Sequence, residues 1–117
     1  MRSYVSLRGR REFSLTMRRG AAASTPALTV HVLSPPARIA GPAKVGVVVT
    51  RKVGKAVVRN KVRRRCKAVL ESLLAPGDAN WYVIACKPSA ATLRFAQLRR
   101  QLLEAMPKAA RSRGPRA

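Results

Sequence analysis

The chain has 117 residues, with 25 Lys or Arg against 4 Asp or Glu and a formal net charge of +21 at pH 7. This length predicts one domain with a modest core, and no apolar stretch approaches the roughly 18 residues of a membrane-spanning helix. The N-terminus has charges but no apolar signal region, so we expect a cytoplasmic protein. A domain with this charge repels itself, which indicates an anionic partner: nucleic acid first, an anionic membrane surface second.

Periodicity and turn residues divide the chain into short elements. In order, these are a flexible basic segment over 1–9, a helix over 10–19, a loop over 21–26, a strand over 28–33, a Pro- and Gly-rich turn over 34–42, a strand over 44–50, a helix over 57–74, a strand over 80–85, a helix over 94–106 and a disordered basic tail over 107–117. We expect the turn over 34–42 to join its neighbouring strands in a hairpin, and a further strand is possible within 21–43. Phe95 falls with Leu98 and Leu102 on one face of the last helix.

This order predicts an α+β fold, a two-layer α/β sandwich with helices packed on a small mixed sheet of about four strands, in the order α-β-β-β-α-β-α. The strand–helix–strand unit from 44 to 85 should contain parallel strands. Residues 10–106 are expected to form a single RNA-binding domain. Cys66 and Cys86 are interpreted as two buried thiols in a reducing compartment.

The chain is organised around residues 51–65, in which eight of fifteen residues are Lys or Arg and none is acidic. In the helix expected over 57–74, Val62 and Cys66 belong to an apolar arc, and Arg59 and Arg65 lie at its two edges. Cations fill the first half of this helix, although the partial positive charge of the free N–H groups there favours acids. This reversal indicates a bound polyanion rather than a merely solvated face.

The residues offer little for catalysis. Clustered carboxylates, as two-metal hydrolysis or glycosidase chemistry requires, are missing, because the acids are scattered over Glu12, Glu71, Asp78 and Glu104. His31 has no recognisable Ser and acid partners, the two Cys and one His lack metal-site spacing, and Gly54-Lys55 is not a complete phosphate-binding loop. Zinc spacing, a leucine zipper and a helix-turn-helix pair are also missing, so we expect no DNA partner and favour a folded RNA surface.

The stretch RKVGKAVVRNKVRRRCK, residues 51–67, resembles the signature of the protein subunit of bacterial ribonuclease P, in which a strand and a Lys-rich turn lead into an Arg-Asn-Arg helix. The resemblance extends to LRGRREF at 7–13, VGVVVTRKVGKAVVRN at 45–60, WYVIACKP at 81–88 and LRFAQLRRQL at 93–102. It implies a non-catalytic protein whose partner, the catalytic RNA subunit, removes the 5′ leader of precursor tRNA. It also implies no cofactor held by the protein alone, Mg²⁺ at the RNA active site, no membrane partner and a left-handed βαβ crossover.

Position by position, the resemblance implies two sets of contacts. Contacts to the catalytic RNA subunit are expected from Lys52, Lys55, Arg59, Asn60, Lys61, Arg63, Arg64, Arg65 and Lys67. A cleft for the single-stranded leader is expected to be lined by Phe13, Met17 and His31. Lys61 stands where the family usually has a third Arg, and Met17 where a second Phe is usual, so electrostatic tracking of the leader is favoured over stacking.

Other interpretations remain at this point. A small ribosomal or ribosome-assembly protein would share the charge and size but would not need a leader cleft. An autonomous nuclease is disfavoured by the scattered acids, and a membrane-active helix by the position of the basic helix between two strands.

Overall fold

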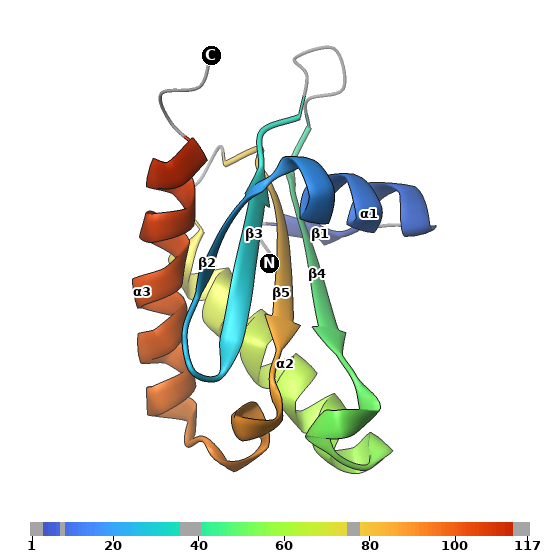
Figure 1. Ribbon diagram of the computed structural model, residues 1–117, viewed down its shortest axis with the longest axis vertical. Helices are drawn as coiled ribbons and strands as arrows, with labels where there is room; N and C mark the ends of the chain where they lie inside the picture. Colours follow the sequence, from blue (N-terminus) through green and yellow to red (C-terminus); the bar gives the residue numbers. More distant parts are fainter. Residues whose placement is uncertain (1–3, 8, 36–40, 75–77, 114–117) are drawn as a thin grey trace.

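The computed structural model describes residues 4–7, 9–35, 41–74 and 78–113. Its elements are β1 (Tyr4–Ser6), α1 (Gly9–Arg19), β2 (Ala21–Ser24), β3 (Leu28–Leu33), β4 (Ala43–Val49), the 3-10 turn η2 (Arg51–Val53), α2 (Ala56–Leu73), β5 (Trp81–Cys86), the 3-10 turn η3 (Pro88–Thr92) and α3 (Phe95–Arg113). The strands form a five-stranded sheet in the order β1-β4-β5-β3-β2 (Figure 1). The predicted α+β fold, with helices packed on a mixed sheet, is confirmed.

Strand β5 is the centre of the sheet. It runs parallel to β4 and antiparallel to β3, so that Ile84 lies opposite Val47 on one side and Val30 on the other. The predicted parallel strands of the β4–α2–β5 unit are confirmed. The prediction of a hairpin between β3 and β4 is wrong, because β5 lies between these two strands. The continuous apolar run from Trp81 to Ile84 is buried, as is typical of a strand with neighbours on both edges.

The crossover from β4 to β5 is left-handed. In Figure 1, both strands point downward, α2 crosses behind the sheet between them, and β5 lies to the left of β4. Crossovers between parallel strands are right-handed in ≈ 98% of cases, so this connection is an exception to the rule. It agrees with the crossover that the resemblance implies.

Helices cover both faces of the sheet. The main core lies between the sheet and the helices α2 and α3, and its fully buried side chains include Val30, Val45, Cys66, Leu70, Ile84 and Leu102. On the opposite face, α1 packs Phe13 and Leu15 against a second cluster of Leu7, Trp81 and Val83. The prediction of two layers therefore missed α1, which crosses the front of the sheet in Figure 1. Because successive side chains of a strand point to opposite faces of the sheet, the strands contribute residues to both clusters.

Three segments differ from the predicted boundaries. Residues 1–9 were expected to be flexible, but Tyr4–Ser6 forms β1, parallel to β4, with the Tyr4 ring buried. The expected loop over 21–26 contains β2, paired antiparallel with β3. Helix α3 continues to Arg113, although a disordered tail was expected from residue 107; residues 114–117 of that tail lie outside the described part of the chain. Strands of three or four residues are too short to show a period, and Ala, Lys and Arg beyond Pro107 are strong helix formers.

Cys66 and Cys86 are both buried and free, as predicted. Their sulfur atoms lie 3.8 Å apart and join α2 to β5. The hydrogen bond with Cys86, together with burial, raises the pKa of the Cys66 thiol, which therefore stays protonated at neutral pH. The pair acts as a small apolar contact within the main core.

Candidate nucleic-acid interface

A tight turn delivers the chain from β4 into α2. Val53 is buried, and the amide N–H groups of Val53 and Gly54 donate to the carbonyls of Thr50 and Arg51 at 3.0 and 3.1 Å. Gly54 has a φ of +153°, a conformation that side chains disfavour. Lys52 within the turn and Lys55 after it are both exposed. The predicted Lys-rich turn thus presents both cations to solvent at the start of the helix.

The start of α2 has no side-chain cap. Lys55 occupies the N-cap position and makes no side-chain hydrogen bond to the helix, and no acid lies in the first turn. The first N–H groups of a helix have no partner within it and carry a partial positive charge. Together with the exposed lysines, they form a surface that favours an anion.

The outer face of α2 is a shallow basic hollow. It is lined by Val57, Asn60, Arg63, Arg64 and Lys67. Nη1 of Arg63 donates to Oδ1 of Asn60 at 2.8 Å, one turn earlier, which orients the two side chains together. Val57 is 80% exposed, so the hollow combines positive charge with apolar contact area. The opposite face of the helix buries Val62, Cys66, Val69 and Leu70, as the periodicity predicted.

Arg59 and Arg65 lie at the edges of this face, as their position on the helix predicted. Both are half-buried. Nη1 of Arg65 donates to the carbonyl of Leu93 at 3.0 Å and ties α2 to the segment before α3. Nε of Arg59 is buried without a hydrogen-bond partner. Since a guanidinium has five N–H donors, each still has donors for an anion.

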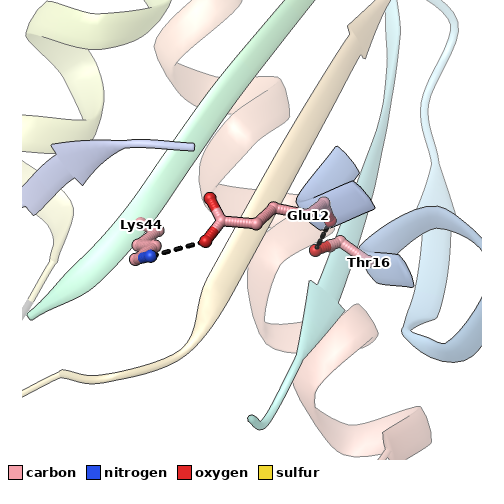
Figure 2. Close-up of polar contacts among 3 residues, drawn as sticks. All are labelled: Glu12, Thr16 and Lys44. Carbon is pink, nitrogen blue, oxygen red and sulfur yellow. Dashed lines mark hydrogen bonds and ion pairs between the residues drawn. The ribbon is translucent and has the colours of Figure 1, made fainter. Parts of the chain in front are cut away.

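Helix α1 is fastened to the sheet at its start. Nζ of Lys44 on β4 lies 2.6 Å from Oε2 of Glu12 (Figure 2). The same nitrogen lies 5.1 Å from the centre of the Trp81 ring. The hydroxyl of Thr16, buried beneath the helix, donates to the carbonyl of Glu12 at 2.8 Å. Glu12, the acid in the first turn of α1, is therefore neutralised by a lysine of the sheet.

The residues expected to line a leader cleft lie where α1 crosses the sheet. Gly46, Val83 and His31 are aligned in one row across β4, β5 and β3. A Cβ at Gly46 would overlap the Phe13 ring, so that ring rests on the glycine backbone. Met17 is one helical turn further along α1, 41% exposed. The structure thus places Phe13 partly in the second core cluster and leaves Met17 open to solvent.

His31 is half-buried on the α1 face of β3, opposite the buried Val30 and Val32, as predicted. Its Nδ1 is buried without a hydrogen-bond partner. Burial lowers the pKa of His31 from its usual value of 6.5, so the ring is neutral at pH 7. A neutral ring at this position offers an apolar surface rather than a charge.

Two further hollows include residues that were not among the predicted site residues. One lies on the outer side of α1 and is lined by Arg10, Arg11, Ser14, Leu15 and Arg18. The other lies between α2 and α3 and is lined by Lys61, Arg64, Arg65, Ala68 and Phe95. Phe95 was expected on the apolar face of the last helix but is 43% exposed. The sequence pattern could not reveal this exposure, because Phe95 keeps the helical spacing of the apolar stripe. It differs from the buried residues of the stripe only in lying at the first position of the helix.

The described part of the chain holds no cluster of three His, Cys, Asp or Glu side chains suited to a metal ion. Asp78 accepts hydrogen bonds from the Asn80 amide and the Tyr82 hydroxyl, so its carboxylate has a structural role. Within the same residues, no helix is long and apolar enough to cross a bilayer. A mixed sheet with an uncapped basic helix on one face defines an α+β protein built to bind a polyanion.

The comparisons with known proteins agree with this class. The family model described as Ribonuclease P matches residues 1–110. The ribonuclease P protein component of Streptomyces avermitilis is 39% identical over 105 residues, which cover 82% of this chain and 84% of that protein. That of Thermus thermophilus is 41% identical over 104 residues, covering 89% of this chain and 59% of that protein. The chain therefore belongs to the ribonuclease P protein family, whose members are subunits of an endoribonuclease of tRNA processing.

Solved structures show the same fold. The RNase P protein of Staphylococcus aureus matches with a TM-score of 0.79 at 18% identity, over 89% of this chain and 94% of that chain. The RNase P protein of Thermotoga maritima matches with a TM-score of 0.70 at 24% identity, over 85% of this chain and 92% of that chain. The comparisons give no support to a ribosomal or ribosome-assembly protein.

The lowered pKa of His31 predicts a loss of stability in weak acid. Below pH 6.5 the unfolded chain takes up a proton on His31 that the folded chain resists, so stability present above this pH falls as the pH decreases. His31→Gln should remove the effect, because His31 is the one histidine of the chain. Urea unfolding of both proteins between pH 7.5 and 5.0 measures this. Equal pH dependence in the two would contradict it.

Proposed function

We propose that the outer face of α2 and the turn before it bind the catalytic RNA of ribonuclease P. The observation that carries the proposal is the uncompensated charge of the helix start, where cations and uncapped N–H groups point outward together. The residues assigned to this contact are Lys52, Lys55, Arg59, Asn60, Lys61, Arg63, Arg64, Arg65 and Lys67. Arg and Asn suit paired phosphate and ribose contacts, and Lys adds point charges.

Hydrogen bonds and ion pairs within the described part of the fold do not explain the charge of α2. Of the described hydrogen bonds of these side chains, one joins Arg63 to Asn60 within the face and one joins Arg65 to Leu93. The ion pair between Lys44 and Glu12 lies on the opposite face of the sheet. A phosphate backbone would neutralise the cations and release the counterions that they hold.

The protein supplies binding and the RNA supplies the chemistry in this proposal. Hydrolysis of a phosphodiester by metal ions needs ligands that hold the ions, and the described carboxylates are apart and partly engaged within the fold. Mg²⁺ is therefore assigned to the RNA active site, with no cofactor on the protein alone. The bound protein lowers the repulsion between the catalytic RNA and its substrate, so less Mg²⁺ is needed.

The 5′ leader of precursor tRNA is assigned to the α1 side of the sheet. Phe13, Met17 and His31 are assigned to contact it, since the first two lie one turn apart on α1 and His31 shares the sheet row of Gly46. An extended single strand fits across such a row, and the arginines of α1 can track its phosphates. The neutral His31 adds a flat surface.

Cleavage of a precursor tRNA with a 5′ leader at low Mg²⁺ tests the proposal. Protein alone, catalytic RNA alone and the two together are compared. We expect cleavage at the leader junction when both are present and none from the protein alone. The proposal fails if the protein does not enhance cleavage by the RNA, or if the protein cleaves without it.

Arg64→Ala should weaken binding to the catalytic RNA by roughly tenfold, because a hydrogen bond to a charged group is lost. The slope of log affinity against log salt should fall in magnitude by about 0.9 for the one phosphate contact removed. Arg99→Ala is the matched control, since Arg99 is exposed on α3 and lines none of the three hollows. A slope that Arg64→Ala leaves unchanged would rule out its phosphate contact.

Met17→Ala should reduce affinity for leader-bearing precursor tRNA by roughly fivefold, which corresponds to the burial of about one methylene group. Affinity for mature tRNA should not change. Met17 belongs to neither core cluster, so folding should be preserved. Phe13→Ala should show the same selectivity with an added loss of stability, because its ring packs in the second cluster. Equal losses for both substrates would mean that these residues are not leader contacts.

A further inference from the structure

The hollow between α2 and α3 differs in composition from the other two hollows described above. It combines one exposed aromatic ring, Phe95, with three cations, Lys61, Arg64 and Arg65, and with the small side chain of Ala68. Phe95 is the first residue of α3 and belongs to neither core cluster. Its ring is therefore available for contact with a ligand.

The position of Phe95 follows from how α3 begins. The helix packs on β2 and β3 through residues further along, of which Leu98 and Leu102 are fully buried. Figure 1 shows α3 starting beside η3, at the lower end of the sheet. Phe95 precedes the stretch that the sheet covers, so its ring is left between α2 and solvent.

The segment before Phe95 is held in place. Nη1 of Arg65 donates to the carbonyl of Leu93, and the amide of Arg94 donates to Oε1 of Gln97 at 2.9 Å. The amide of Leu98 donates to the carbonyl of Arg94 at 3.0 Å and starts the helix. These bonds fix the segment that carries Phe95 before any ligand arrives, which lowers the ordering cost of binding.

The chemistry of the hollow selects its ligand. An apolar peptide would bury three cations without partners, and a simple anion would make no use of the ring. A duplex keeps its base faces stacked inside. An unpaired nucleotide satisfies both features, because its base can stack on an aromatic ring while its phosphates meet the cations.

We propose that an unpaired base of the catalytic RNA stacks on Phe95, with its flanking phosphates on Lys61 and Arg64. The inference rests on the proposed contact between α2 and that RNA. Arg64 lines both this hollow and the basic hollow of α2, so the two surfaces are continuous and are occupied by the same RNA strand. The leader is assigned to the other face of the sheet.

The test measures binding of the catalytic RNA to the full chain and to five variants. Phe95→Ala and Phe95→Leu should weaken binding roughly 5- to 100-fold, the range for loss of one base–aromatic stack, whereas Phe95→Tyr keeps the ring and should bind within about twofold. Leu103→Ala is the matched control, because Leu103 is 42% exposed on the same helix and lines no described hollow. It should bind as the unmodified chain does.

Two readouts separate stacking from charge. Loss of an uncharged ring should leave the salt slope unchanged, while Lys61→Ala should lower it by about 0.7–0.9. Chemical probing of the RNA should show one unpaired nucleotide that the unmodified protein protects and Phe95→Ala does not. The unfolding midpoint of each variant is measured alongside and should not change.

The outcomes distinguish this inference from the proposed function. If the unmodified chain does not bind the catalytic RNA, the proposed function itself fails. If it binds and Phe95→Ala binds equally well, the stacking site is wrong. Binding by Phe95→Leu at full strength would mean simple apolar contact, and an equal loss with a duplex RNA of the same length would mean that no unpaired base is involved; either result overturns the inference.

Discussion

The apolar face of α2 holds a strongly positive surface in place against its own repulsion. Val62, Cys66, Val69 and Leu70 are at most 3% exposed. Burying one Val or Leu side chain is worth about 1.5–3 kcal/mol, whereas a pair of like charges one turn apart costs roughly 0.2–0.5 kcal/mol. Packing therefore exceeds repulsion along the helix. Without this anchor, cations at the helix start, where the dipole also opposes them, would have no reason to stay together.

Much of the fold follows from local patterns. The strand before the basic turn, the amphipathic α2 and the parallel strand after it were predicted, because each has a clear period and neighbours close in sequence. The place of β5 between β3 and β4 was not, since Ile84 pairs with residues tens of positions away on both sides. Sheet order is decided by such distant pairings, which no local period reports.

The candidate site, like the fold, could be predicted from the sequence only in part. Exposed and edge positions on α2 were predicted well, because a helix of known phase fixes which side each residue takes; Arg59 and Arg65 lie half-buried at the edges as expected. Where α1 lies was not predictable from its sequence. The seat of Phe13 depends on Gly46, whose missing side chain leaves room for the ring, and that residue is 33 positions further along the chain. The exposure of Phe95 likewise depends on where the sheet ends beneath α3.

The central place of β5 has a consequence for how the chain folds as it is synthesised. Before residue 81 emerges, β1 can pair with β4, and β2 with β3, but the strand that lies between β4 and β3 has not yet been made. Each pair then exposes an unpaired edge, the feature that favours wrong association between chains. The highly charged segment that becomes α2 is made just before β5, and its repulsion between neighbouring chains keeps these edges apart. By this argument, the cations that we propose bind RNA would also protect the half-formed sheet until β5 has been made.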